Sequence, residues 1–172
     1  MMFIGIDPGK SGGMALLGPA GIVMEIEPTP VVKAGKTGRD EFDLAAIRGL
    51  LHYWARRESE GCFVTVEKSQ PLPPKMGGTV ANFARGVGRG WEWMCVGLGL
   101  PYQLVAPQTW QKAMHAGTPE GDTKQRSILA AHRLFPGVSL LRTERSRVPH
   151  DGLAEALLLA EFGRRVHSGG QA

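Results

Sequence analysis

Cysteine is scarce in this sequence, and long apolar runs are absent from it. The 172 residues include only two cysteines, Cys62 and Cys95, each among apolar neighbours. Two cysteines without a paired Cys or His spacing exclude a disulfide-stapled scaffold and a cysteine-based zinc site. No apolar run reaches the roughly 18 residues that a membrane-spanning helix requires, and residues 1–10 lack the basic flank and apolar core of a secretory signal. These absences predict a cytoplasmic protein without a membrane partner.

The composition is that of a folded domain. Hydrophobic residues make up 42% of the chain and charged residues 21%, which excludes disorder throughout. A chain of this length buries roughly 70% of its unfolded surface and needs no covalent staples. We predict a single domain over residues 1–166, followed by a flexible tail over residues 167–172.

Positive charge is concentrated in the middle and late parts of the chain. Residues 68–149 contain 11 Lys and Arg against 4 Asp and Glu, a net charge of +7, whereas the remainder has a net charge of −3. Such asymmetry is typical of proteins that bind an anionic polymer. The alternative is a solvated surface that happens to be basic, so charge alone leaves nucleic-acid binding open.

Apolar periodicity predicts an α/β fold. Short apolar runs bounded by turn residues indicate buried strands, and an apolar spacing of three or four residues indicates amphipathic helices. An opening hairpin followed by strand–helix crossovers gives a mixed sheet with helices on both faces. Strands are predicted over residues 2–6, 12–17, 21–26, 62–66 and 102–105, helices over residues 43–57, 79–97, 107–114, 124–134 and 150–166, and exposed loops over residues 28–40 and 68–78.

Four acids fall where the predicted elements begin or end. Asp7 follows the first strand and Glu67 the fourth, so their carboxylates meet at one edge if these strands are parallel neighbours. Asp151 opens the last helix and Glu155 lies one turn later, which places both acids on one helix face. Glu155 stands among leucines and alanines, and an acid in such surroundings requires a partner.

Convergence of Asp7, Glu67, Asp151 and Glu155 would bring four negative charges together. Hard oxygen ligands of this kind suit Mg²⁺ or Mn²⁺, and two such ions support phosphodiester hydrolysis. Each acid alone has a plainer interpretation, because strand-end acids often belong to turns and Asp151 can serve as a helix cap. The combination, rather than any single acid, indicates a metal-dependent nuclease.

Four segments, in order, resemble RuvC-type Holliday junction resolvases of the RNase H-like superfamily. The first motif alone is moderately specific, whereas the four together span residues 2 to about 165. The matching segments are residues 4–9 (IGIDPG) with 11–13 (SGG), residues 64–67 (VTVE), residues 121–124 (GDTK) and residues 150–157 (HDGLAEAL).

The resemblance implies a five-stranded RNase H-like sheet whose first three strands are antiparallel. It also implies a homodimer that cuts a four-way DNA junction symmetrically, with two Mg²⁺ or Mn²⁺ ions per active site and no nucleotide cofactor. Asp7, Glu67 and Asp151 would then be catalytic metal ligands, with Glu155 assisting. Lys124 would contact the scissile phosphate or the attacking water and offset the carboxylate charge.

Two features depart from the family pattern. The last helix in cellular members carries its acids at i, i+3, whereas Asp151 and Glu155 stand at i, i+4, so either acid is a candidate for the principal ligand. The family's aromatic wedge after the strand-end glutamate is absent, which leaves Leu72 or Met76 as candidates to enter a base step. These differences indicate a divergent, phage-type branch, acting in the host cytoplasm if phage-encoded.

Basic residues outside the acidic cluster are the candidate DNA contacts, because junction recognition relies mainly on phosphates. About half of them are expected to touch DNA, and the others to solvate helix faces; His150 alternatively occupies the turn after Pro149. The predicted helix over residues 79–97 combines small residues with aromatics, which favours a dimer contact, with core packing as the alternative. The candidates are Lys75, Arg85, Arg89, Lys112, Arg142, Arg145, Arg147 and His150.

Other functions share parts of this pattern. Residues 7–13 also resemble the first phosphate loop of actin-like kinases, but the sequence has neither the second Asp-Gly-Gly loop nor the second domain of those proteins. A non-catalytic junction-binding module would not need the acids. The closer alternatives are a flap nuclease or an RNA–DNA hybrid nuclease, and symmetric cutting by a dimer would separate the resolvase from both.

Overall fold

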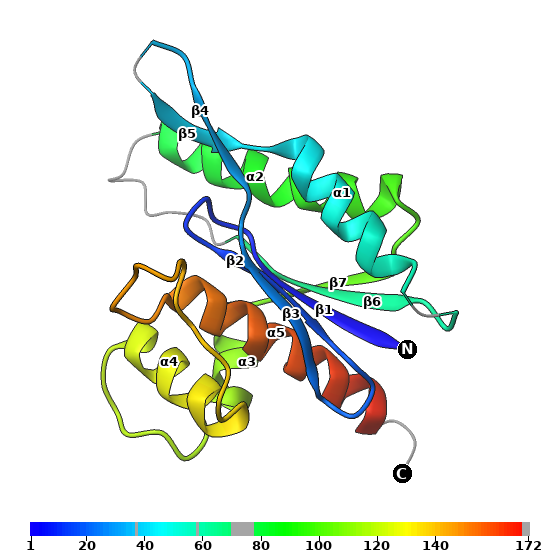
Figure 1. Ribbon diagram of the computed structural model, residues 1–172, viewed down its shortest axis with the longest axis vertical. Coiled ribbons are helices and arrows are strands. Elements are labelled where there is room, and N and C mark those ends of the chain that lie inside the picture. Colours follow the sequence, from blue (N-terminus) through cyan, green and yellow to red (C-terminus); the bar gives the residue numbers. More distant parts are fainter. Residues whose placement is uncertain (37, 58, 70–77, 170–172) are drawn as a thin grey trace.

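The computed structural model describes residues 1–36, 38–57, 59–69 and 78–169, and over residues 78–85 it describes the main chain alone. Within these residues the chain alternates strands and helices much as the periodicity predicts (Figure 1). The strands are β1 (Met2–Asp7), β2 (Gly13–Leu17), β3 (Val23–Pro28), β4 (Val31–Ala34), β5 (Arg39–Phe42), β6 (Cys62–Glu67) and β7 (Tyr102–Val105). The helices are α1 (Leu44–Ala55), α2 (Gly78–Gly97), α3 (Pro107–Met114), α4 (Thr123–Leu134) and α5 (Asp151–Ser168).

Five of the strands form one mixed sheet in the order β3-β2-β1-β6-β7. The first three strands pair antiparallel, whereas β6 runs parallel to both β1 and β7. Ile6 of β1 stands opposite Val66 of β6, so these two neighbouring strands end at the same edge of the sheet. The predicted five-stranded mixed sheet with an antiparallel opening is confirmed.

The prediction of a loop over residues 28–40 is wrong in part. This segment contains an antiparallel pair, β4 and β5, in which Val31 stands opposite Phe42. A cross-strand ion pair joins Lys33 Nζ to Asp40 Oδ1 at 2.7 Å, and the Phe42 ring meets the Trp91 ring of α2 edge-on. The proline, lysine and glycine content of the segment concealed a hairpin whose last residue, Phe42, packs on α2.

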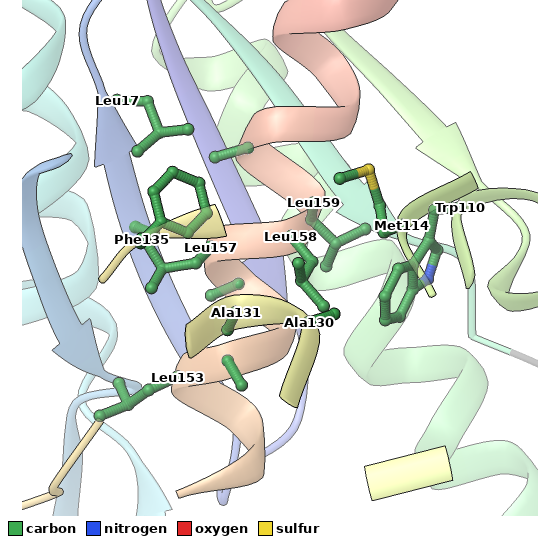
Figure 2. Packing of buried hydrophobic residues seen from close by; sticks show 14 of the residues in the cluster. Leu17, Trp110, Met114, Ala130, Ala131, Phe135, Leu153, Leu157, Leu158 and Leu159 are labelled. Atoms are coloured by element: carbon green, nitrogen blue, oxygen red, sulfur yellow. The ribbon is translucent and has the colours of Figure 1, made fainter. Parts of the chain in front are cut away.

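Helices cover both faces of the main sheet, as predicted (Figure 1). Alternation along β1 directs Ile4 and Ile6 into a core shared with α1 and α2, and Phe3 into a second core shared with α3, α4 and α5. In Figure 2, Trp110 and Met114 of α3 lie beside Leu158 and Leu159 of α5 in this second core. No helix within the described residues is both long and apolar enough to cross a bilayer.

Helix α5 crosses β1 at very short range. A Cβ atom on Gly5 would overlap the main chain of α5 at Ala156 and Ala160. At the start of the helix, a Cβ atom on Gly152 would lie 2.7 Å from the Cα atom of Gly12. Glycine at positions 5 and 152 therefore permits the contact that brings the first turns of α5 to the end of β1.

Candidate active site

The end of β1 and the end of β6 place two acids side by side. Asp7 is the last residue of β1, and Glu67 is the last residue of β6. Because these strands are parallel neighbours with Ile6 opposite Val66, both carboxylates emerge at one edge of the sheet. The predicted meeting of Asp7 and Glu67 therefore follows from the strand register.

The first turns of α5 bring the other two acids to the same edge. Gly152 packs against the main chain of Ser11 and Gly12, directly after β1. The helix end that carries Asp151 and Glu155 therefore packs against the loop that follows Asp7. Asp151 remains partly exposed, whereas Glu155 stands among fully buried leucines and alanines.

The carboxylates of this site raise one another's pKa values. Burial, together with the charges of Glu67 and Asp151, raises the pKa of Asp7 from 3.8 to about 7. Burial likewise raises the pKa of Glu155 from 4.5 to about 8, with contributions from Asp7, Glu67 and Asp151. Burial also raises the pKa of Glu67. Without a cation, the folded chain therefore disfavours full ionisation of this cluster.

Asp151 forms an ion pair with Lys124, the predicted catalytic lysine. Lys124, in the first turn of α4, lies with its Nζ 2.5 Å from Asp151 Oδ2. The Lys124 side chain is 70% exposed and that of Asp151 30%, so the pair sits at the rim of the cluster. This lysine holds the pKa of Asp151 below its usual value despite burial. Lys124 thus offsets the charge of Asp151, and its contact with a scissile phosphate or an attacking water stays a prediction.

Sequence reasoning missed three further side chains at the site. Trp110 Nε1 of α3 donates a hydrogen bond of 2.8 Å to Glu67 Oε2. Ser127 Oγ of α4 donates one of 3.1 Å to Glu155 Oε1, and His115 Nε2 lies 3.0 Å from the same Ser127 oxygen. In a single sequence these residues look like ordinary core positions of two helices, so no local signal could have identified them.

The donor set suits a hard divalent cation. Asp7, Glu67 and Glu155 supply carboxylate oxygens in surroundings that resist uncompensated negative charge, and Asp151 adds a fourth carboxylate at the rim. In the described part of the chain, no group of three or more acidic, histidine or cysteine side chains stands close enough to hold an ion as it is. The fit of these residues to a divalent cation therefore rests on their oxygen donors and on the effect that each carboxylate has on the pKa values of the others.

The predicted DNA-contacting residues occupy several surfaces. Arg89 is exposed near Glu92, and together with Lys68 and Ser69 it lines an open pocket of about 390 Å³ beside Glu67. Lys112, Arg142, Arg145 and Arg147 are exposed. Outside the described part of the chain lie Lys75, the side chain of Arg85, and the two wedge candidates Leu72 and Met76.

His150 serves as the N-cap of α5. Its Nδ1 accepts a hydrogen bond from the main-chain N–H of Leu153 at 3.3 Å, and the side chain is half-buried. Burial lowers the pKa of His150, and the charges of Arg142 and Lys124 act in the same direction. The residue therefore has a structural role in the turn after Pro149, and contact with a phosphate stays a prediction.

Comparison with known proteins relates the chain to solved structures only. No known family model matches the sequence, and no curated protein sequence does either. The structure of T. thermophilus RuvC in complex with a Holliday junction substrate superposes with a TM-score of 0.61 at 17% identity, covering 98% of this chain and 97% of that one. A second Thermus thermophilus RuvC structure gives 0.58 at 20% identity, with the same coverage. The chain therefore has the RNase H-like α/β fold of RuvC over nearly its whole length.

Proposed function

We propose that this protein is a divalent-metal-dependent endonuclease that resolves four-way DNA junctions. The observation that carries the proposal is the set of acids at the ends of β1 and β6 and in the first turns of α5. Asp7, Glu67 and Glu155 are coupled electrostatically in partly buried surroundings, on a fold shared with a protein solved on a Holliday junction. A structural role alone gives no reason to gather carboxylates where burial penalises their charge.

Metal binding is assigned to Asp7, Glu67 and Glu155, with Asp151 at the rim. Two Mg²⁺ or Mn²⁺ ions bound there would activate water and stabilise the oxygen that leaves phosphorus. The raised pKa values of Asp7 and Glu155 mean that these carboxylates release protons as cations are taken up. Partial burial lowers the local dielectric and strengthens the attraction of these carboxylates for a cation.

Lys124 is assigned to the phosphate. Its ammonium is mostly exposed and is held at the rim by Asp151, so a phosphate oxygen can approach it from solvent. In hydrolysis, the water oxygen bonds to phosphorus, the ester P–O bond breaks, and the departing oxygen takes a proton. Lys124 would neutralise the phosphate charge that builds up in that step.

The DNA arms are assigned to the exposed arginines and lysines around this edge. Arg89 lines the pocket beside Glu67, and the exposed Arg142 is close enough for its charge to act on both Asp40 and His150. These side chains can reach phosphates without reading bases. Their contribution should therefore weaken strongly as salt is raised.

Helix α2 is assigned to a homodimer contact. Its buried face, which includes Trp91 and Cys95, packs in the core. Its other face exposes Trp93 and Val96, whose exposed fractions are 74% and 65%. An apolar groove of about 270 Å³ between α1 and α2, lined by Phe42 among others, adjoins this helix. Large exposed apolar side chains beside such a groove favour a protein–protein contact.

The test is cleavage of a labelled synthetic four-way junction with Mg²⁺ or Mn²⁺, beside linear duplex, flap and RNA–DNA hybrid controls. Wild type is compared with Asp7→Asn. Paired symmetric nicks that disappear in the variant, while junction binding persists, are expected. Junction binding without any cut under either ion would indicate a non-catalytic module. Preferential cutting of the hybrid or the flap would retain the fold and the acids but change the substrate.

A further inference from the structure

The two glutamates of the site each accept a hydrogen bond from a buried side chain of the α3–α4 layer. The indole N–H of Trp110 donates to Glu67, and the hydroxyl of Ser127 donates to Glu155, at 2.8 and 3.1 Å. Trp110 and Ser127 are both completely buried, so neither donor has water as an alternative partner. Asp7, with one fewer rotatable bond, ends β1, and its carboxylate accepts a hydrogen bond from the main chain of Gly9.

His115 joins these two donors to each other. Its Nε2 lies 3.0 Å from Ser127 Oγ, and its ring meets the Trp110 ring edge-to-face, with centroids 5.6 Å apart and planes at 80°. The His115 side chain is itself only 3% exposed. A continuous path of contacts therefore runs from Glu67 through three buried side chains to Glu155.

The direction of the hydrogen bonds follows from the donors available. Glu155 must be ionised to bind a cation, and an ionised carboxylate only accepts, so the single hydroxyl proton of Ser127 then points to Glu155. Ser127 Oγ must then accept from His115, which requires a proton on His115 Nε2. Burial and the nearby Arg126 charge lower the pKa of His115, in agreement with a neutral ring. Trp110 Nε1, His115 Nε2 and Ser127 Oγ thus each donate one hydrogen bond along the path.

We propose that Trp110, His115 and Ser127 form a positioning bridge that holds the carboxylates of Glu67 and Glu155 ready for a divalent cation. The inference rests on the proposed function, because it assigns these glutamates to the metal. Glutamate side chains have several rotatable bonds, and fixing them before the cation arrives removes an ordering cost from binding. Partners in the next layer commonly orient metal ligands in this way.

The chain contains a matched control for this proposal. Trp54 is also completely buried, and its Nε1 donates a 2.5 Å hydrogen bond to Glu25, but it belongs to the core on the other face of the sheet. Trp110→Phe and Trp54→Phe therefore delete the same group from equally buried sites. Any effect of lost packing should be common to both variants, whereas an effect on cation binding should be confined to Trp110→Phe.

The test measures Mn²⁺ binding to the DNA-free protein by electron paramagnetic resonance of the free ion. Trp110→Phe and Ser127→Ala should each weaken binding by roughly 10- to 100-fold, whereas Trp54→Phe should stay within about twofold of wild type. The double variant Trp110→Phe/Ser127→Ala should lose less than the product of the two single effects, because the first deletion already breaks the path. His115→Gln, which keeps an N–H donor, should bind Mn²⁺ more tightly than His115→Leu.

Wild-type protein gives a second readout that needs no variant. In a Mg²⁺ titration followed by ¹H–¹⁵N NMR, the indole N–H signal of Trp110 should shift and that of Trp54 should stay in place. Wild-type-like Mn²⁺ binding by Trp110→Phe and Ser127→Ala, with binding lost in Asp7→Asn, would overturn the bridge and keep the metal site. Absence of Mn²⁺ binding by wild type would overturn the metal site and the bridge with it.

Discussion

Removing the charge of Asp7 should stabilise the metal-free protein. Burial and the neighbouring acids raise the pKa of this side chain from 3.8 to about 7. The folded chain therefore holds the Asp7 proton more tightly than the unfolded chain does. The stability that comes from this proton is fully present below about pH 4 and is lost as the pH rises through about 7. Asn at this position carries no charge at any pH and keeps an oxygen acceptor.

The size of the effect follows from the two pKa values. Moving a carboxyl pKa from 3.8 to about 7 lowers the free energy of unfolding by about 4 kcal/mol once the group is ionised. Between these values the advantage of Asp7→Asn should grow by up to about 1.4 kcal/mol per pH unit. At pH 8 the variant should therefore melt roughly 8–16 °C above wild type, at about 2–4 °C per kcal/mol for a chain of this size.

Glu155 shares this repulsion. Its pKa of about 8 includes the effect of Asp7, so removing either charge eases the ionisation of the other. Asp7→Asn combined with Glu155→Gln should therefore gain less than the sum of the single variants. Coupling of this kind makes about 4 kcal/mol for Asp7→Asn an upper value.

The assay is urea and thermal unfolding in a chelator from pH 4 to pH 8.5, repeated with Mg²⁺. Mg²⁺ should stabilise wild type above pH 7, because it binds the ionised acids of the folded state, and should do much less for Asp7→Asn. A stability difference between variant and wild type that does not change with pH would refute the reasoning. So would a variant that is less stable than wild type at pH 8 without metal.

Three further predictions test other parts of the structure. Gly5→Ala should lower the free energy of unfolding by at least about 3 kcal/mol, measured by urea denaturation, because the new methyl overlaps the main chain of α5. Glu155→Gln should reduce junction cleavage by about 10³-fold or more with junction binding retained. Asp151→Asn chiefly releases Lys124 from its ion pair, so it should reduce junction cleavage by about tenfold or less. Trp93→Glu should shift the protein to monomer in sedimentation while leaving its circular dichroism unchanged.

The sequence was sufficient for the parts of the site that depend on local signals. Asp7 and Glu67 each follow a short apolar strand and precede a turn, and their meeting needs only that the two strands be parallel neighbours. The order of strands and helices also depends on local signals. Apolar residues repeat every two residues in a strand and about every 3.6 residues in a helix. The β4–β5 hairpin was missed because its stability depends on cross-strand and α2 contacts, such as that of Phe42 with Trp91.

Tertiary geometry decided what the sequence left open. Whether Asp151 or Glu155 faces the strand-end acids depends on the rotation of α5 about its axis, and this rotation is set by contact between Gly152 and Gly12. The sequence favoured Asp151, whereas in the structure Asp151 pairs with Lys124, and the half-buried Glu155 lies within electrostatic reach of Asp7 and Glu67. We therefore propose Glu155 as the principal ligand from α5.

The close approach of α5 to β1 explains why the acidic site and the stability of the fold oppose each other. A helix packed on Gly5 without an intervening side chain brings Glu155 to the end of the strand that carries Asp7. The same packing removes water from both carboxylates and raises their pKa values. A looser contact would relieve this penalty but would also let solvent compete with a phosphate for the cation. The metal-free protein should therefore be least stable at the pH at which its acids are ready to bind metal, and cation binding should restore what their ionisation removes.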